Sequence, residues 1–219
     1  RRRGPQILIE METKMLKLYY SPGACAMASH IALEEAGADH QLQKIDLKQG
    51  EQRTPEYLAV NPAGVTPALA TDQGVITQNV AILAYIAQTH PKANLAPLDD
   101  PYAFARMQAF NAWLASSLHP AIGKVLFSRP PLEGAARDDA LEQALTKYDL
   151  AEQHLLAGPW ALGEDHSVTD GYLMVFTRWA RQADLLDQRR FPGLNAHLDR
   201  VQSRPAVQRA LAIEGLSAI

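Results

Sequence analysis

Short runs of alternating apolar and polar residues predict a mixed αβ arrangement at the start of the chain. Strand-like runs lie at 16–20 and 42–47, and an apolar helical pattern covers 24–36 between them. Gly37 follows that pattern directly, and glycine is the common residue just past a helix end. The pattern therefore predicts strand, helix and strand in that order.

A hairpin and a further helix are expected next. The turn residues Asp72-Gln73-Gly74 separate two apolar runs. The expected elements are a short helix at 55–60, strands at 67–70 and 75–77, and a helix at 79–88. Residues 15–90 thus predict a domain with the order βαβαββα.

The rest of the chain carries helical patterns alone. Residues 91–101 hold three prolines and two aspartates without an apolar period, which is typical of a linker. Helices are then expected at 102–128, 136–157, 168–184, 192–203 and 205–213. The predicted fold class is α/β followed by all-α, with a helical domain over 102–219.

The helix expected from residue 168 has a clear start signal. Ser167 and Asp170 have the spacing of a capping box, in which the hydroxyl and the carboxylate each accept from a backbone N–H group. A mostly apolar helix with such a cap is typical of the buried centre of a domain. The packing residues expected on it are Leu173, Val175, Phe176 and Trp179.

The composition is that of an ordinary globular protein. The 219 residues are 47% hydrophobic and 21% charged with a net charge of −3, a length that suits two small domains. This balance lacks the basic face that nucleic-acid binding requires. The single cysteine forms no intramolecular disulfide, so a reducing cytoplasm fits the sequence.

Targeting and membrane segments are not expected. The apolar run at 7–9 is too short for a secretory signal, and we interpret residues 1–14 as an extension or tag before the folded unit. No stretch approaches the roughly 20 apolar residues that span a bilayer. A cytoplasmic protein without a membrane partner is therefore predicted.

Cys25 is the first candidate for chemistry. The predicted helix places its thiol in a first helical turn, where the macrodipole and unpaired N–H groups favour the thiolate. Such sites lower a thiol pKa from about 8.5 to roughly 4 to 7, and they equally stabilise the thiolate of a bound small molecule. The alternative is that Cys25 is a small buried apolar residue.

Two further segments suit a peptide-like ligand. If the Thr66–Pro67 bond is cis, the N–H and C=O groups of Thr66 point outward and are free to pair with a peptide. Gln78 and Asn79 lie at a helix start, which favours a carboxylate, although plain N-capping by Asn79 is the alternative. A thiol site, a strand-like edge and a carboxylate site together suit a small cysteine-containing peptide such as glutathione.

Seven segments between residues 15 and 213 carry a family resemblance. They are KLYYSPGAC (17–25), HIALEEAG (30–37), NPAGVTPAL (61–69), TQNVAILAYIA (77–87), SSLHPA (116–121), SVTDGYL (167–173) and FPGLNAHLDRVQSRPAVQRAL (191–211). In this order and spacing the sequence resembles the glutathione S-transferase superfamily, and most of all its bacterial beta class. The resemblance implies a thioredoxin-like domain followed by a helical domain, a homodimer, and a detoxification enzyme that conjugates glutathione to hydrophobic electrophiles.

The resemblance also implies roles for residues of the N-terminal domain. Cys25 matches the beta-class cysteine that contacts glutathione or forms a mixed disulfide with it, and Tyr20 matches a tyrosine close by. Thr66 matches the residue whose backbone pairs with the cysteinyl unit of glutathione, and Pro67 matches the cis-proline that follows it.

The remaining matched positions concern the two carboxylates and the helical domain. Gln78 and Asn79 match the pair that holds the γ-glutamyl carboxylate, and His119 matches a histidine that lines the active site. A basic residue after the second strand usually meets the glycyl carboxylate, for which Lys48 is the candidate and Arg53 the reserve. The alternative for His119 is that it is simply a packed or surface histidine without a role in the site.

The chain departs from the beta-class pattern at three places. Ala26 stands where many members have a serine, and Gln78-Asn79 replaces a more usual acidic-plus-small pair. An expected asparagine falls on Ala112, although Asn111 is adjacent. These changes favour a redox or binding specialisation as the alternative to conjugation.

Neither a metal nor a nucleotide is expected. The sequence contains no GxGxxG, no P-loop and no HExxH motif. The other histidines show no metal-ligand spacing; they are His30, His40, His90, His154, His166 and His197.

Three functions remain open on the sequence. The first is a glutathione transferase, with Met107, Trp113 and Phe127 supplying the hydrophobic half of its site. The second is a glutathione-dependent monothiol disulfide reductase that acts through Cys25. The third is a catalytically inactive glutathione-binding or scaffolding protein.

Overall fold

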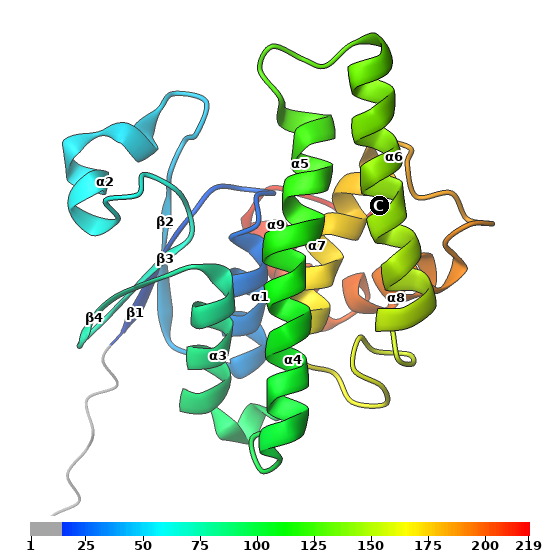
Figure 1. Ribbon diagram of the computed structural model, residues 1–219. Coiled ribbons are helices and arrows are strands. Elements are labelled where there is room, and N and C mark those ends of the chain that lie inside the picture. The colour runs from blue at the N-terminus through cyan, green and yellow to red at the C-terminus, as the bar shows by residue number, and fades with distance from the viewer. Residues whose placement is uncertain (1–14) are drawn as a thin grey trace, which may run out of the picture.

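A computed structural model describes residues 15–219, and the expected extension or tag at 1–14 lies outside the described residues. The N-terminal domain is built on a four-stranded sheet in the order β2-β1-β3-β4 (Figure 1). Its strands are β1 (Leu16–Tyr20), β2 (His40–Lys44), β3 (Ala68–Thr71) and β4 (Gly74–Thr77). Strand β2 is parallel to β1, whereas β3 is antiparallel to both β1 and β4.

The alternation in β1 explains how the sheet is covered. Leu16, Leu18 and Tyr20 are buried while the residues between them are half-exposed, because successive side chains of a strand point to opposite faces. Helices α1 (Met27–Ala36) and α3 (Asn79–Thr89) pack together, and their apolar residues join the same core. The short helices η1 (Glu51–Arg53) and α2 (Pro55–Val60) follow β2, and in Figure 1 α2 lies on the side of the strands away from α1.

The C-terminal part of the described chain is helical. Its elements are α4 (Pro101–Trp113), the π-helical turn η3 (Leu114–Leu118), α5 (His119–Phe127), α6 (Gly134–Leu150), the π-helical turn η4 (Ala151–Leu155), α7 (Val168–Gln182), α8 (Pro192–Gln202) and α9 (Pro205–Ile213). Helix α1 packs against α7 and α9, so one apolar core runs through both parts of the molecule. No helix in the described range 15–219 is both long and apolar enough to cross a membrane.

Helix α7 is the buried centre that the sequence predicts. Every residue from Val168 to Ala180 is buried. The capping box is confirmed, because the Ser167 hydroxyl accepts from the Thr169 N–H at 3.3 Å and Asp170 accepts from the Ser167 N–H at 2.7 Å. The cap satisfies backbone groups that would otherwise be buried without partners.

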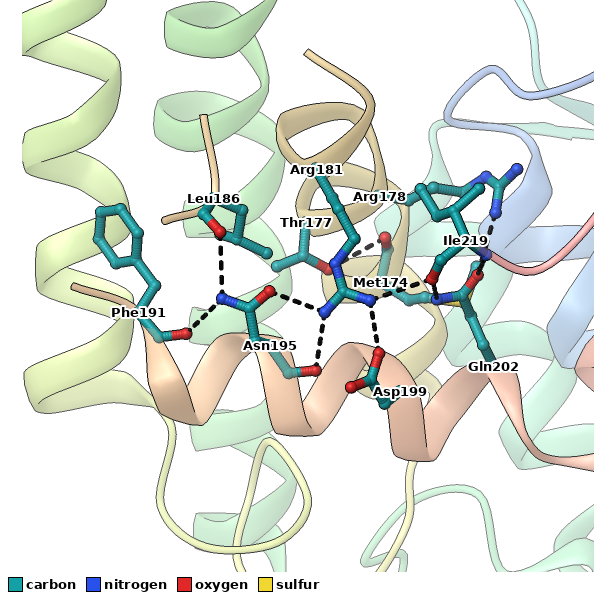
Figure 2. A network of polar contacts seen from close by, with 10 residues as sticks. All are labelled: Met174, Thr177, Arg178, Arg181, Leu186, Phe191, Asn195, Asp199, Gln202 and Ile219. Carbon is teal, nitrogen blue, oxygen red and sulfur yellow. Dashed lines mark hydrogen bonds and ion pairs between the residues drawn. The ribbon is translucent and has the colours of Figure 1, made fainter. Parts of the chain in front are cut away.

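A polar network fixes the far end of α7 against α8 and the last residues of the chain (Figure 2). Arg181 donates to Asp199 and to the Asn195 side-chain oxygen, the latter at 2.7 Å, and also to Ile219 O at 3.0 Å. Arg178 donates to Gln202 at 3.0 Å. The network holds α7 in place, which matters because α7 also reaches the site described below.

Several expected boundaries shift. Helix α1 begins at Met27 instead of residue 24, because the chain first forms turns in which the Ala24 N–H donates to Ser21 O and the Met27 N–H donates to Ala24 O. Strand β2 begins at His40 instead of residue 42. The single helix expected at 102–128 is divided by η3, and the linker expected at 91–101 contains η2 (Pro91–Ala93) and the first residue of α4.

Candidate active site

A cleft of about 690 Å³ opens between the sheet domain and helices α5 and α7. One wall comes from the loop after β1, the segment after β2 and the loop before β3, and the other comes from the helices. The lining residues are Ser21, Pro22, Gly23, Ala24, Cys25, Lys44, Asp46, Leu47, Lys48, Gln52, Arg53, Gly64, Val65, Thr66, His119, Phe127 and Trp179. Its size and mixed polarity suit a small organic ligand.

Cys25 lines this cleft and is partly exposed. Its Sγ donates a weak hydrogen bond to Thr66 O at 3.8 Å. In the described part of the chain, neither the Cys25 N–H nor the Ala26 N–H has a backbone acceptor. Both donors face the Cys25 sulfur, and an anion bound beside that sulfur can share them.

The expected lowering of the Cys25 pKa is wrong for the protein alone. Burial raises the pKa of the Cys25 thiol to about 11, and the N–H groups of Cys25 and Ala26 and the Asn79 amide offset only part of that rise. The physical reason is that α1 starts three residues later than expected, so Cys25 precedes the first helical turn while apolar residues surround it. Cys25 is therefore a neutral thiol at physiological pH.

Thr66 offers the peptide-like edge that the sequence suggests. The Thr66–Pro67 bond is cis, as expected. Val65 O is already occupied, since it accepts from Tyr57 Oη at 2.7 Å and from Asn61 Nδ2 at 2.6 Å. In contrast, the Thr66 N–H has no acceptor within residues 15–219, so the segment just before β3 remains open to a ligand.

The structure separates the roles of Gln78 and Asn79. Asn79 is buried, and its amide accepts from Ser29 Oγ at 2.6 Å and donates to Cys25 O at 2.8 Å. It is not the N-cap of α3, because that position is Gln78, which has a φ of 72° and an exposed side chain. Neither residue is among those that line the cleft.

Tyr20 does not reach the cleft either. It is buried, and its ring lies 5.8 Å from the ring of His30, centroid to centroid. Burial and the nearby Glu214 carboxylate raise the pKa of Tyr20, so its phenol stays protonated. The structure therefore brings Cys25 and Thr66 together but leaves Tyr20 outside the cleft lining.

Three cations line the sheet-side wall of the cleft. Lys48 and Arg53 are the two predicted residues, and Lys44 at the end of β2 joins them. Arg53 also donates to Ala63 O at 3.5 Å, which directs its guanidinium toward the loop before β3. Sequence reasoning missed Lys44, because the strand expected at 42–47 placed this residue inside the strand, whereas β2 ends at Lys44.

The opposite wall is aromatic. His119 is the first residue of α5, and its ring centroid lies 5.2 Å from Phe176 and 5.4 Å from Trp179. Burial lowers the pKa of His119, so the imidazole is neutral at pH 7. Phe127 packs edge-on against Trp179 at 5.1 Å and is 56% exposed.

The hydrophobic half of the site differs in part from the expectation. Phe127 lines the cleft as expected, but Met107 is fully buried and Trp113 is not among the lining residues. Trp179 on α7 was expected only as a packing residue. It packs against His119 and Phe127, and it also lines the cleft. The helical pattern could not predict that Trp179 both packs and lines the cleft, because the pattern does not say which end of the helix meets the sheet domain.

Contacts from distant segments hold the loop before Cys25. Trp179 Nε1 donates to Gly23 O at 2.8 Å, and the Gly23 N–H donates to Glu214 Oε2 at 2.8 Å. Glu214 Oε1 lies 2.8 Å from His30 Nδ1. These supports were missed by sequence reasoning because their partners are more than 150 positions apart.

Comparisons with known proteins agree with this geometry. The family model for the N-terminal domain of glutathione S-transferase matches residues 14–88. Over 207 residues the chain is 35% identical to glutathione S-transferase GST-4.5 of Xanthomonas campestris, which covers 92% of this chain and all of that relative. The chain belongs to the glutathione S-transferase family.

Solved structures of glutathione S-transferases share the fold. A glutathione transferase homologue from Sulfitobacter with bound glutathione is 33% identical, with a TM-score of 0.82 over 92% of this chain and 99% of that one. A beta-class glutathione S-transferase from Sphingomonas chungbukensis is 36% identical, with a TM-score of 0.81 over 91% and 99%. The predicted thioredoxin-like N-terminal domain and helical C-terminal domain are confirmed.

Proposed function

We propose that this glutathione S-transferase joins the sulfur of glutathione to a hydrophobic electrophile in the cleft. The observation that carries the proposal is the contrast between the two walls. One wall offers open backbone groups at Thr66, N–H groups of Cys25 and Ala26 that have no backbone acceptor, and cations. The other offers an aromatic surface.

Glutathione fits the donors of the sheet-side wall. The Thr66 N–H group has no acceptor and the Thr66 C=O group accepts only the weak bond from Cys25 Sγ, so both suit the backbone of the cysteinyl unit, because an extended peptide pairs through such groups. Lys48, with Lys44 and Arg53 beside it, suits the glycyl carboxylate. Gln78, exposed at the start of α3, suits the γ-glutamyl carboxylate, and Asn79 acts through the backbone of Cys25 instead of touching the ligand.

The reaction needs the tripeptide sulfur as a thiolate. Cys25 remains protonated at its pKa of about 11, so its S–H group turns from Thr66 O to donate to the anionic sulfur of glutathione instead of competing as a nucleophile. The N–H groups of Cys25 and Ala26 add two further donors. Neutral His119 accepts the proton that the tripeptide thiol gives up.

The electrophile binds against Phe127, Trp179 and the ring of His119. These rings present an apolar surface beside the sulfur, and holding both reactants there makes the attack effectively unimolecular. The thiolate sulfur forms a bond to the electrophilic carbon, and the displaced group leaves with its electron pair. The class of acceptor is thus an apolar, preferably aromatic, electrophile.

The state of the Cys25 thiol makes the disulfide-reductase alternative less favourable. Attack on a disulfide needs a Cys25 thiolate, and the raised pKa of Cys25 disfavours that form. Cys25→Ala separates the two functions, since a reductase loses its activity while a transferase retains part of its own. Glutathione binding with no turnover over a broad panel of electrophiles would instead support the scaffolding alternative.

The assembly and location complete the proposal. A homodimer is proposed because exposed apolar residues mark the edge of the N-terminal domain and the first turn of α4, namely Val75 at 45% and Tyr102 at 75%. A cytoplasmic location fits the free thiol of Cys25. Sedimentation analysis tests the dimer, and a monomer at all concentrations would remove it.

The direct test of the function is binding followed by turnover. Calorimetry should detect glutathione binding to the full chain, and Thr66→Pro, which removes the free N–H group, should weaken it. An aryl halide should then be consumed with formation of the thioether. Failure to bind glutathione would remove the enzyme proposal, whereas binding without thioether formation would remove only the conjugation step.

A further inference from the structure

Three metal-ligating side chains meet outside the cleft, where α1 approaches the start of β2. They are His30 and Glu34 on α1 and His40 on β2, and one ligand atom of each lies within 4.8 Å of those of the other two. None of the three lines the cleft. We propose that this cluster binds a divalent transition metal ion of the Zn²⁺ class.

His30 supplies the strongest argument. Its side chain is fully buried, and its Nδ1 lies 2.8 Å from Glu214 Oε1. A carboxylate oxygen accepts, so in the neutral imidazole Nδ1 carries the hydrogen and Nε2 carries a lone pair. Nε2 is buried without a hydrogen-bond partner in the described part of the chain, and leaving such an atom unpaired costs about 1 to 3 kcal/mol. A metal ion would satisfy it.

His40 is oriented in the same way. Its Nδ1 lies 2.8 Å from Ala38 O, which can only accept, so the second nitrogen again has its lone pair free. That Nε2 lies 3.8 Å from Glu34 Oε1, and the His40 ring centroid is 6.0 Å from that of His30. A hydrogen bond on the other ring nitrogen is the usual way in which proteins orient a metal-binding histidine.

Glu34 follows His30 by one helical turn, which places both side chains on the same face of α1. Its Oε2 accepts from Arg209 Nε of α9 at 2.7 Å, and its Oε1 is the oxygen nearer to His40. Arg209 fixes the carboxylate while leaving one oxygen for a metal. Each of the three ligands therefore has its own supporting partner, as in established metal centres.

The ligand set determines the kind of ion. Two imidazoles and one carboxylate are a common three-residue set for Zn²⁺, with a fourth position for water. Bonds of about 2.0–2.1 Å require ligand atoms on the order of 3.4 Å apart, so separations that now reach up to 4.8 Å must shorten by up to about 1.4 Å. The side chains of His40 and Glu34 are 10% and 13% exposed and can adjust around the buried His30.

Sequence reasoning excluded a metal because the histidine spacing follows no known pattern. The third ligand comes from a different element, and parallel pairing of β2 with β1 brings His40 back beside α1. The proposal thus revises that expectation on the basis of the fold.

The test uses Co²⁺ as a spectroscopic probe on the full chain after treatment with a chelator. The proposal predicts one Co²⁺ per chain with visible ligand-field bands, which Zn²⁺ abolishes by competition. His40→Gln and Glu34→Gln should each weaken Co²⁺ binding by at least about 10-fold. His154→Gln is the matched control, because His154 is exposed on η4, and it should bind Co²⁺ as the wild type does.

The melting temperature with and without Zn²⁺ gives a second measurement, which also applies to variants whose folding is altered. Zn²⁺ should raise the melting temperature of the wild type and of His154→Gln but not that of His40→Gln, since only a folded site that binds metal shifts the unfolding equilibrium. The proposal is overturned if Co²⁺ gives no visible bands at one equivalent. It is also overturned if His40→Gln binds as tightly as wild type or if His154→Gln removes the signal.

Discussion

Trp179 Nε1 donates to Gly23 O at 2.8 Å, which ties the central helix of the C-terminal domain to the loop that leads into Cys25. The Gly23 N–H donates in turn to Glu214 after α9. Gly23 has a φ of 71°, a conformation that glycine adopts without strain. The loop that holds the Cys25 sulfur is thus positioned by residues from the other domain.

Trp179→Phe tests this tie. Phenylalanine keeps an aromatic ring beside His119 and Phe127 but removes the N–H donor to Gly23 O. We expect kcat/KM for conjugation to fall by about 5- to 10-fold, which corresponds to one hydrogen bond of roughly 1 kcal/mol. Trp160→Phe is the control, since Trp160 does not line the cleft. Equal kinetics for Trp179→Phe and the wild type would contradict the role.

The Cys25 thiol should react slowly at neutral pH. With a pKa of about 11, roughly one thiol in ten thousand is ionised at pH 7, and alkylation by iodoacetamide should accelerate through pH 10. Because the thiol acts as a donor, Cys25→Ser should retain most conjugation, whereas Cys25→Ala should lose about 10- to 100-fold. An alkylation midpoint near pH 6, or a Ser variant as inactive as the Ala variant, would exclude the donor role.

Gln78 and Asn79 should respond differently to truncation. Asn79→Ala removes the buried contacts to Ser29 and Cys25 O, so the free energy of unfolding should fall by about 1 to 3 kcal/mol in urea denaturation. Gln78→Ala should leave stability unchanged and weaken glutathione binding by about 5-fold in calorimetry. The reverse pattern would return the ligand contact to Asn79.

Asp170 should control acid stability. Burial alone would raise the pKa of Asp170, but hydrogen bonds from His197 and the Ala161 N–H hold it below 3.8. Its contribution is therefore fully present above the ordinary carboxyl pKa and is lost as pH falls through the lowered value. Asp170→Asn should lower the free energy of unfolding by about 3 to 5 kcal/mol near neutral pH. It should also make that free energy depend less on pH in the acid range. Asp138→Asn, an exposed change on α6, should do neither.

The order of elements was predictable because it rests on local signals. The turn at Asp72-Gln73-Gly74, the stop at Gly37 and the cap at Ser167 each act within a few residues, and all three lie where expected. The predicted helix boundary was wrong where a backbone hydrogen bond from a nearby turn sets the conformation. The Ser21 carbonyl captures the Ala24 N–H, which delays α1 and moves Cys25 out of the helix.

The sequence predicted which segments meet at the candidate site but not how packing changes their chemistry. Cys25, Thr66 and the basic segment after β2 meet in the cleft because the strand order brings their loops to one edge. The raised pKa of Cys25 was not predictable, since burial depends on packing between distant elements. The same holds for the second role of Trp179 and for the meeting of His30 with His40.

The central claim is that glutathione binds along Thr66 with its sulfur held as an anion by the S–H group of Cys25 and the N–H groups beside it. Ultraviolet difference titration of the thiolate of bound glutathione tests this directly, because Cys25, with a pKa of about 11, should stay almost entirely protonated in the pH range where the bound tripeptide titrates. We predict a midpoint at least one pH unit below the free thiol value of about 8.5, and a return toward that value in Cys25→Ala. A midpoint equal to that of free glutathione in the wild type would contradict the account.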